Sequence, residues 1–332
     1  MSIPITTLSP SEISYIQTSL ADPIQPIRSD SRGLFDSREI QISYGIFPHA
    51  NGSAKLKFGN TEIIAGIKLE VVDSKLKSSE KYPGNESWRC KVEVDITPQS
   101  FPSASPNSLS SLSTYLSSII QSNFVENLKP FEIIKNQKYF QPNLHLTLLS
   151  FDGNLLNGLI LSSRLAFSDL KLPKIKVISW TGEENIQDGI IGKGDLSGIK
   201  AAISQKKGGN KNKNKLLTKG SEDWDLDLSG SDNGLTYMKN RKNLPVVVTL
   251  NLVPNSDNIF IDATAQEESA CPSKIHLFFN STTTEEEEEI KLSGIRLEGG
   301  QSIDKSRIGG LLEKGFEIAK DMITEMNNSL PQ

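Results

Sequence analysis

The sequence predicts an α+β fold of mixed helices and strands. Segments with apolar residues at every second position are typical of strands, and they occur in both halves of the 332-residue chain. Two longer segments, 109–124 and 304–326, carry apolar stripes at helical spacing. The predicted order is sheet, helix, strand and helix, followed again by strands and a helix.

The N-terminal extension, residues 1–26, is predicted to hold a short helix. Ser9 and Glu12 have the spacing of a capping box, and Pro10 stands at the first helical position ahead of an apolar stripe. Pro23 and Pro26 end the helix, because proline lacks the amide hydrogen that a helix needs.

A three-stranded antiparallel meander follows. Its strands are the alternating segments 38–45, 53–58 and 61–72. The dipeptides Asn51-Gly52 and Gly59-Asn60 separate them, and both suit the positive φ of tight turns. Both glycines are therefore predicted to lie in turns.

The rest of the first half, which is predicted to span 27–181, adds two strands and two helices. Segment 88–96 alternates as a strand, with Cys90 on its apolar face as a reduced core thiol. Apolar spacing then predicts a helix over 109–124, a buried strand over 144–151 and a covered helix over 155–167.

A change of composition separates the two halves. Lysine, asparagine and glycine followed by acidic residues mark 204–241 as a disordered insertion, or alternatively as a basic loop that attracts RNA. The second half, 242–328, is predicted to contain four strands followed by a final helix from about 304 to 326. These strands are 245–253, 259–262, 275–279 and 290–297, with a charged tip at 285–289.

Composition excludes several classes of protein. A net charge of −4 argues against a protein that grips nucleic acid unaided, because such proteins are usually basic. Two distant cysteines and three histidines form no pattern spaced like a metal site. The sequence has neither an apolar stretch of membrane-spanning length nor the apolar core of a signal peptide, so we expect an intracellular protein that does not enter a membrane.

Three motifs in segment 28–61 carry a resemblance to a known family. They are R-S-D-S-R at 28–32, N-G-S-A at 51–54 and G-N-T at 59–61. Together they resemble the start of an RNase PH-type domain, which typically carries R-x-D-G-R and then G-S-A-x-x-x-x-G-x-T. The resemblance implies an RNase PH-like fold of the ribosomal protein S5 domain 2-like kind, with two β-α-β-α halves. Ser31 stands where the motif has glycine, which leaves the backbone conformation there open.

Active members of this family hold phosphate at a D-G-G-[ST]-R-like turn that opens a helix. The matching residues are Asp152 and Gly153, followed by Asn154, Leu155 and Leu156. Leucines replace the hydroxyl and the guanidinium that would hold an oxyanion beside the helix N-terminus. The resemblance therefore marks positions 154–156 as a vestigial phosphate site.

The family's acidic region also departs from the active pattern. The run D-A-T-A-Q-E-E supplies Asp262, Glu267 and Glu268, but segment 269–274 lacks the further aspartate of active members. Paired carboxylates for metal binding or proton transfer are thus incomplete, and we interpret these three acids as vestigial, in a turn and interface element. The helix that carries RNA-path arginines in relatives has no basic residue here, which leaves Lys135 and Lys138 as candidates.

The chain keeps the motifs that shape the fold but lacks the side chains that would hold phosphate. In this combination it resembles the RNase PH-like ring subunits of the eukaryotic RNA exosome core. The resemblance implies a subunit with no catalytic residue, no metal and no cofactor, which helps to form a channel for RNA. The implied partners are other RNase PH-like subunits, S1/KH cap subunits, a hydrolytic exoribonuclease and RNA. The implied locations are the nucleus, the nucleolus and the cytoplasm. An active phosphate-dependent 3′–5′ exoribonuclease and an RNA-binding module acting through the lysine-rich insertion are the alternatives.

Overall fold

The computed structural model describes residues 7–73, 89–134, 137–178, 223–227, 234–283, 288–300 and 302–331. The chain divides into two compact units, which are Met1–Pro173 with Leu235–Gln332, and Lys174–Gly234. In the smaller unit, β8 (Ile175–Ile178) pairs antiparallel with β9 (Asp223–Leu226).

Two strands lie within segment 204–241, which the sequence predicts to be disordered. β9 pairs with β8, and in the larger unit β10 (Leu235–Tyr237) pairs antiparallel with β7 (Lys171–Pro173). The prediction of disorder fails for both strands. In β9, Trp224 and Leu226 alternate with aspartates in a strand pattern that the surrounding charge conceals. Residues 204–222 and 228–233 of the segment lie outside the described residues.

The N-terminal helix α1 (Pro10–Ala21) begins with the predicted capping box. The Ser9 hydroxyl accepts a hydrogen bond from the Glu12 amide, and the Glu12 carboxylate accepts one from the Ser9 amide. Leu20 of α1 is buried with Phe260 and Ala270 of the second half. The helix therefore docks on the C-terminal part of the chain.

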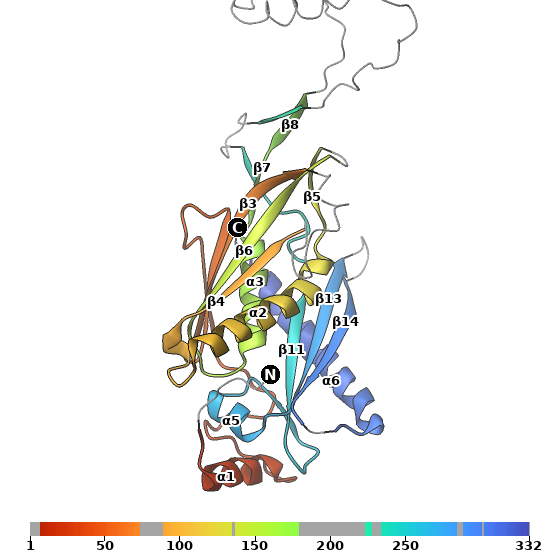
Figure 1. Ribbon diagram of the computed structural model, residues 1–332. Helices are drawn as coiled ribbons and strands as arrows, with labels where there is room; N and C mark the ends of the chain where they lie inside the picture. The colour runs from red at the N-terminus through yellow and green to blue at the C-terminus, as the bar shows by residue number, and fades with distance from the viewer. Residues whose placement is uncertain are drawn as a thin grey trace, which may run out of the picture. The chain divides into compact units, whose positions relative to one another are not determined.

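The first sheet has the strand order β1-β2-β3-β6-β4, with β5 also paired to β6 (Figure 1). Adjacent strands are antiparallel except for β4 and β6, which are parallel. The bounds are β1 (Ile40–Tyr44), β2 (Gly52–Phe58), β3 (Thr61–Asp73), β4 (Lys91–Ile96), β5 (Phe131–Ile134) and β6 (Lys138–Ser150). The predicted meander corresponds to β1, β2 and β3.

One of the two predicted turn glycines has a different role. Gly59 lies in the β2–β3 turn with φ of 54°, as predicted. Gly52, however, is the first residue of β2, and the positive φ of the preceding connection belongs to Gly45. A Cβ at Gly52 would stand 2.6 Å from the Ala166 carbonyl oxygen, so glycine is needed there because a helix passes close to the strand.

Two helices accompany the first sheet. α2 (Pro106–Asn123) packs on β4, and α3 (Leu155–Ser168) packs on β2 and β3 (Figure 1). α3 also contacts a strand of the second sheet, and it is buried on nearly all sides, as expected of a helix that is apolar all round. Short 3₁₀ turns at Pro98–Ser100 and Val125–Asn127 flank α2.

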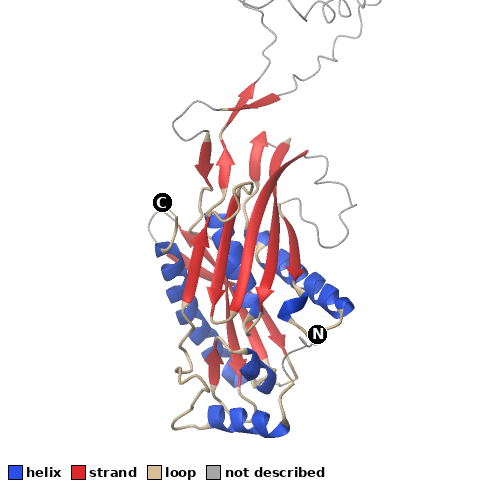
Figure 2. Ribbon diagram, turned by 90° about the vertical axis from the view of Figure 1, so that its left-hand side faces the viewer, coloured by secondary structure: helices blue, strands red, loops and turns tan. Residues whose placement is uncertain are grey.

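The second sheet has the order β12-β11-β13-β14, and all its neighbouring strands are antiparallel. Its bounds are β11 (Val246–Leu252), β12 (Ile259–Ile261), β13 (Lys274–Thr283) and β14 (Glu288–Glu298). The long helix α6 (Lys305–Asn328) packs on β11 and β13, and Figure 2 shows helices beside the strands. α5 (Ala265–Ala270) is a short helix of six residues. Most of the predicted charged tip lies at 284–287, outside the described residues.

Among the described residues, no helix combines the length and the apolar character that a membrane crossing needs.

Candidate functional site

Arg28, the first arginine of the R-S-D-S-R motif, lies fully buried between the N-terminal segment and the second half. Its Nε and Nη2 atoms donate to the two carboxylate oxygens of Glu267 at 2.9 and 2.7 Å. The remaining donors reach the carbonyl oxygens of Ile261 and Asp262 at 3.0 and 2.9 Å. The guanidinium thus forms a bidentate ion pair and donates to two further acceptors. A buried charge requires such partners, because it has lost its hydrogen bonds to water.

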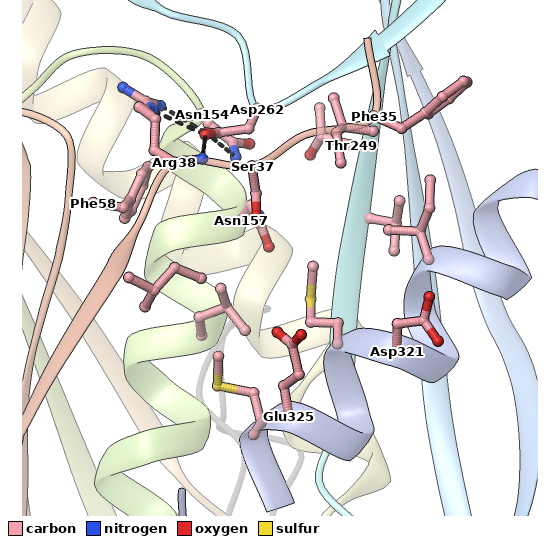
Figure 3. Close-up of a pocket in the computed structure, with 17 residues that line it drawn as sticks. Phe35, Ser37, Arg38, Phe58, Asn154, Asn157, Thr249, Asp262, Asp321 and Glu325 are labelled. Atoms are coloured by element: carbon pink, nitrogen blue, oxygen red, sulfur yellow. Dashed lines mark hydrogen bonds and ion pairs between the residues drawn. The ribbon is translucent and has the colours of Figure 1, made fainter. Parts of the chain in front are cut away.

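Asp262 binds two more arginines from the same N-terminal segment, of which Figure 3 shows Arg38. Arg38 donates from Nε and Nη2 to its two carboxylate oxygens at 2.9 and 2.7 Å, and Arg32 donates from Nη1 at 3.0 Å. The Arg38 amide and the Asn154 side-chain amide add bonds at 2.7 and 3.0 Å. We call the cluster formed by Arg28, Arg32, Arg38, Asp262 and Glu267 the arginine junction.

These partners fix the charge of Asp262. Burial alone raises the pKa of this carboxyl group, but the hydrogen bonds and positive charge of Arg38, aided by the Asn154 amide, outweigh burial and hold the pKa below its ordinary value. Asp262 therefore stays ionised at neutral pH with its oxygens committed to the junction. A carboxylate held in this way is a poor proton carrier.

Three non-glycine residues at or beside the junction have left-handed backbones. Ser31, Asn154 and Asp262 have φ of 63°, 53° and 48°. Ser31 thus keeps a conformation that favours glycine, which answers the question left open by the sequence. Such backbones are costly for residues with a Cβ, so the surrounding contacts must hold them in place.

The turn before α3 meets the second half closely. Gly153 has φ of 83°, and a Cβ there would collide with the Ala263 carbonyl oxygen. At Asn154 the backbone amide donates to Glu268 Oε1 at 3.0 Å, while its side chain turns to Asp262 and does not cap the helix. The helix start is thus used for internal bonds.

Leu155 and Leu156, the first residues of α3, belong to the main hydrophobic core. They are 2% and 6% exposed. They occupy the positions where a phosphate cradle would present a hydroxyl and a guanidinium. Neither side chain can donate to an anion, and both are packed away from solvent.

Glu268 forms a buried ion pair with a lysine that the sequence analysis did not single out. The side chain is 3% exposed, and Oε1 lies 3.3 Å from Lys274 Nζ. Lys274 is the first residue of β13, in the stretch where the resemblance places an aspartate. A buried lysine in that stretch pairs with the remaining acid instead of completing a carboxylate pair.

The structure brings the three predicted acids together with Asn154, but not the predicted RNA-path lysines. Lys135 lies outside the described residues. Lys138 begins β6, whereas Ser150 at the other end of that strand bonds to Asn60, near Asp152. At about 3.3 Å per residue, the strand separates Lys138 from the site by roughly 40 Å.

Sequence reasoning missed two residues of this site. Arg38 lies just outside the recognised motif, and the alternation of 38–45 drew attention to it only as a strand residue. Lys274 was passed over because the absent aspartate was the focus. Two features of the sequence could have revealed them. Lys274 is a basic residue at the start of a predicted strand, and Arg38 is a third arginine close to the motif.

The described residues contain no group of three or more histidine, cysteine, aspartate or glutamate side chains able to hold a metal ion. Cys90 and Cys271 are both free and buried. Burial raises the pKa of both thiols, to about 12 for Cys271, so both stay protonated at neutral pH.

Comparisons with known proteins agree with the resemblance. Residues 36–173 match the model of the 3′ exoribonuclease family, domain 1 (RNase PH). The Exosome complex component Rrp42 of Methanothermobacter thermautotrophicus is 28% identical over 155 residues, which are 45% of this chain and 55% of that protein. A Dictyostelium discoideum protein, provisionally named exosome complex exonuclease RRP42, is 26% identical over 223 residues, or 53% of this chain and 68% of its own. The chain thus spans between about half and two thirds of these relatives.

Solved structures share the fold at low sequence identity. A chain of the Archaeoglobus fulgidus exosome with RNA bound to the active site aligns with a TM-score of 0.57 and 19% identity, covering 95% of this chain and 97% of that chain. Rice Rrp46 aligns with a TM-score of 0.51 and 13% identity, covering 92% and 100%. Residues 36–173 are therefore similar to the first domain of the 3′ exoribonuclease (RNase PH) family, and the described chain has an RNase PH-like α+β fold.

Proposed function

We propose that this chain is a non-catalytic subunit of an exosome core ring that supports 3′–5′ RNA processing and degradation, including maturation of ribosomal RNA. The observation that carries the proposal is the state of the family's reaction site. Buried leucines occupy the phosphate positions, and Lys274 pairs with Glu268. In this arrangement, neither leucine can stabilise the negative charge of a reacting phosphate, and Lys274 is already paired with Glu268.

The relatives support the assembly part of the proposal. Two proteins that match this chain are named as exosome components of the Rrp42 type, and the fold is that of exosome core subunits. The proposed partners are other RNase PH-like subunits, S1/KH cap subunits and a hydrolytic exoribonuclease, with RNA passing through the ring. The proposed locations are the nucleus, the nucleolus and the cytoplasm.

The edge of the second sheet supports a need for neighbours. Among the described strands, β14 pairs only with β13, and it carries Leu292, Ile295 and Leu297 with 41%, 55% and 48% exposure. These residues lie opposite Phe279, Leu277 and Ile275, whose side chains form the core beneath α6. An apolar face that continues to an open strand edge is typical of a surface that another chain covers.

A phosphate-dependent exoribonuclease is the second candidate, since the matching family and the Dictyostelium relative are both named for such activity. The full chain should be incubated with RNA and inorganic phosphate, and release of nucleoside diphosphates measured. We expect none. Phosphate-dependent release that Asp262→Ala abolishes, in protein that remains folded, would establish the nuclease and remove our proposal.

Assembly can be tested separately by mass spectrometry of the proteins that co-purify with the chain. We expect other RNase PH-like subunits, and we expect Ile295→Lys with Leu297→Glu to lose them. Val71→Lys is the matched control, because Val71 is 46% exposed but lies on the first sheet. A chain that purifies alone as a stable monomer contradicts the ring proposal.

A further inference from the structure

A cavity of about 240 Å³ lies between α3 and α6, beside the arginine junction (Figure 3). Asn154 and Asn157 line it from α3, and Asp321 and Glu325 line it from α6. It is smaller than the range of about 300–1,000 Å³ that accommodates drug-sized ligands. The space therefore suits a short side chain or a small molecule, and not a nucleotide.

On the α3 side of the cavity, two buried side-chain oxygens accept no hydrogen bond from the described residues. Asn154 is 4% exposed, and its Oδ1 has no hydrogen-bond partner among the described residues. Asn157 Oδ1 is in the same situation. Arg38 and Asp262 also line the cavity, but their polar groups are bonded to each other and to the backbone. A buried acceptor without a partner is costly, so these two oxygens call for a donor.

The mouth of the cavity is negative. Asp321 and Glu325 are exposed, lie one helical turn apart, and form no ion pair with any described residue. Like charges at this spacing repel. The nearby Lys314 is held by Glu317 at 2.7 Å and by the ring of Phe35 at 4.9 Å.

The walls between these two polar ends are apolar. They include Leu161 of α3 and Ile318, Met322 and Met326 of α6. Thioethers adapt to the shape of a flexible aliphatic chain. The cavity thus combines an apolar wall, unpartnered acceptors and negative charge.

We propose that this cavity binds an alkylammonium group, which is a primary ammonium on a short aliphatic stem. The ammonium would donate to the asparagine oxygens, the stem would lie along the methionines, and the carboxylates at the mouth would attract the positive charge without contacting it. The group belongs either to a free aliphatic amine or to a lysine side chain of a bound protein. The proposal does not depend on the proposed ring function.

The methionines give a site-specific test, because the chain has only four and two of them line the cavity. The full chain, labelled at the methionine methyl groups with ¹³C, should be titrated with pentylammonium and, as a neutral control of the same shape, with 1-pentanol. We expect saturable shifts of the Met322 and Met326 signals with pentylammonium alone. Met238 does not line the cavity, so its signal should stay unchanged and also report that the protein is folded.

Variants then identify the groups that recognise the ammonium. Asp321→Asn combined with Glu325→Gln should weaken binding by up to about tenfold, because it removes two negative charges that attract the ammonium, each worth at most about 0.7 kcal/mol at an exposed position. Asn157→Leu should weaken it without changing the charge, and Glu317→Gln should leave it unchanged. No shift of Met322 and Met326, an equal response to 1-pentanol, or undiminished binding in the double variant would each overturn the proposal.

The source of the group can be distinguished by repeating the titration on the chain bound to its co-purifying proteins. If the methionine signals already occupy their bound positions and added pentylammonium has no effect, a lysine side chain of a partner fills the cavity. If pentylammonium still shifts them, the ligand is a free amine.

Discussion

The arginine junction and the cavity share a wall formed by Arg38, Asp262 and Asn154, yet they treat charge in opposite ways. At the junction, the guanidinium groups of Arg28 and Arg38 each meet both oxygens of a buried carboxylate. Around the cavity, Asp321 and Glu325 have no ion-pair partner among the described residues. The difference teaches that the acids of the D-A-T-A-Q-E-E run connect distant segments of the chain. Asp321 and Glu325, which have no such partner among the described residues, lie on α6.

The physical basis of this difference is the cost of removing charge from water. A buried ion is tolerated only with a partner and hydrogen bonds, so matched charge in the interior acts as a structural lock. Exposed acids face no such requirement and can remain available for a ligand. Four substitutions test the contrast, and the first has the largest expected effect.

Arg28→Met should be the most damaging change. It leaves Glu267 buried without its counter-charge, and we expect the free energy of unfolding to fall by about 3–5 kcal/mol in a denaturant titration. Arg307→Met is the control, since its partner Asp257 is 92% exposed and such pairs contribute at most about 1 kcal/mol. Equal losses in the two variants would show that the junction is no stronger than a surface pair.

Asp262→Asn should cost about 3 kcal/mol at neutral pH, because it removes one partner of a buried ionic cluster. Since the pKa of Asp262 is lowered in the folded protein, its contribution is complete above the ordinary value of 3.8 and is lost as the pH falls below it. The stability difference between wild type and variant should therefore shrink in acid. A difference that persists unchanged below the ordinary pKa contradicts this assignment.

Ser31→Gly should stabilise the protein by about 0.5 kcal/mol. Relief of the left-handed backbone, worth about 1–2 kcal/mol, exceeds the extra chain entropy of glycine, which is about 0.4–1 kcal/mol. The same exchange at Ser110, an exposed residue of α2, should instead destabilise by a few tenths of a kcal/mol, because glycine is the poorer helix former. Thermal unfolding of both variants measures the two signs. A loss at Ser31 would mean that its side chain makes a contact worth more than the strain.

Glu325→Gln should produce the smallest change, a gain of about 0.2–0.5 kcal/mol from relieved repulsion with Asp321. Glu317→Gln should change stability less, because its pair with Lys314 at 2.7 Å offsets the repulsion from Glu313 and Asp321, one turn away on each side. Paired denaturation curves at low salt give the comparison, and screening at high salt should erase both effects. A loss at Glu325 would place it among the matched charges.

Much of the fold could be predicted from local patterns. The capping box at Ser9 and Glu12, the alternation of the meander and the stripe of α6 each depend on near neighbours, and each element formed as predicted. The role of Gly52 could not be predicted, because it depends on a helix more than 110 residues later in the sequence. Strand β9 was hidden because its acidic residues resemble those of a disordered segment.

The sequence singled out some residues of the candidate site but not how they are bonded. Asn154, Asp262, Glu267 and Glu268 lie together in the structure, and Arg38 and Lys274 join them. Their partners could not be read from the sequence, since pairing across hundreds of residues leaves no periodic signal. The arginines acquire their roles only when the N-terminal segment meets the second half, whereas Lys274 pairs with Glu268 only six residues away.

The Arg28–Glu267 bond also bears on how the chain matures during synthesis. Its partners are 239 residues apart, and ribosomes add about 5–20 residues per second, so the arginine waits roughly 10–50 s before its carboxylate exists. Helix α1 waits equally long for Phe260 and Ala270. During that interval the nascent N-terminal segment has an unburied apolar face and an unmatched cation, so the growing chain exposes apolar surface that the folded chain buries.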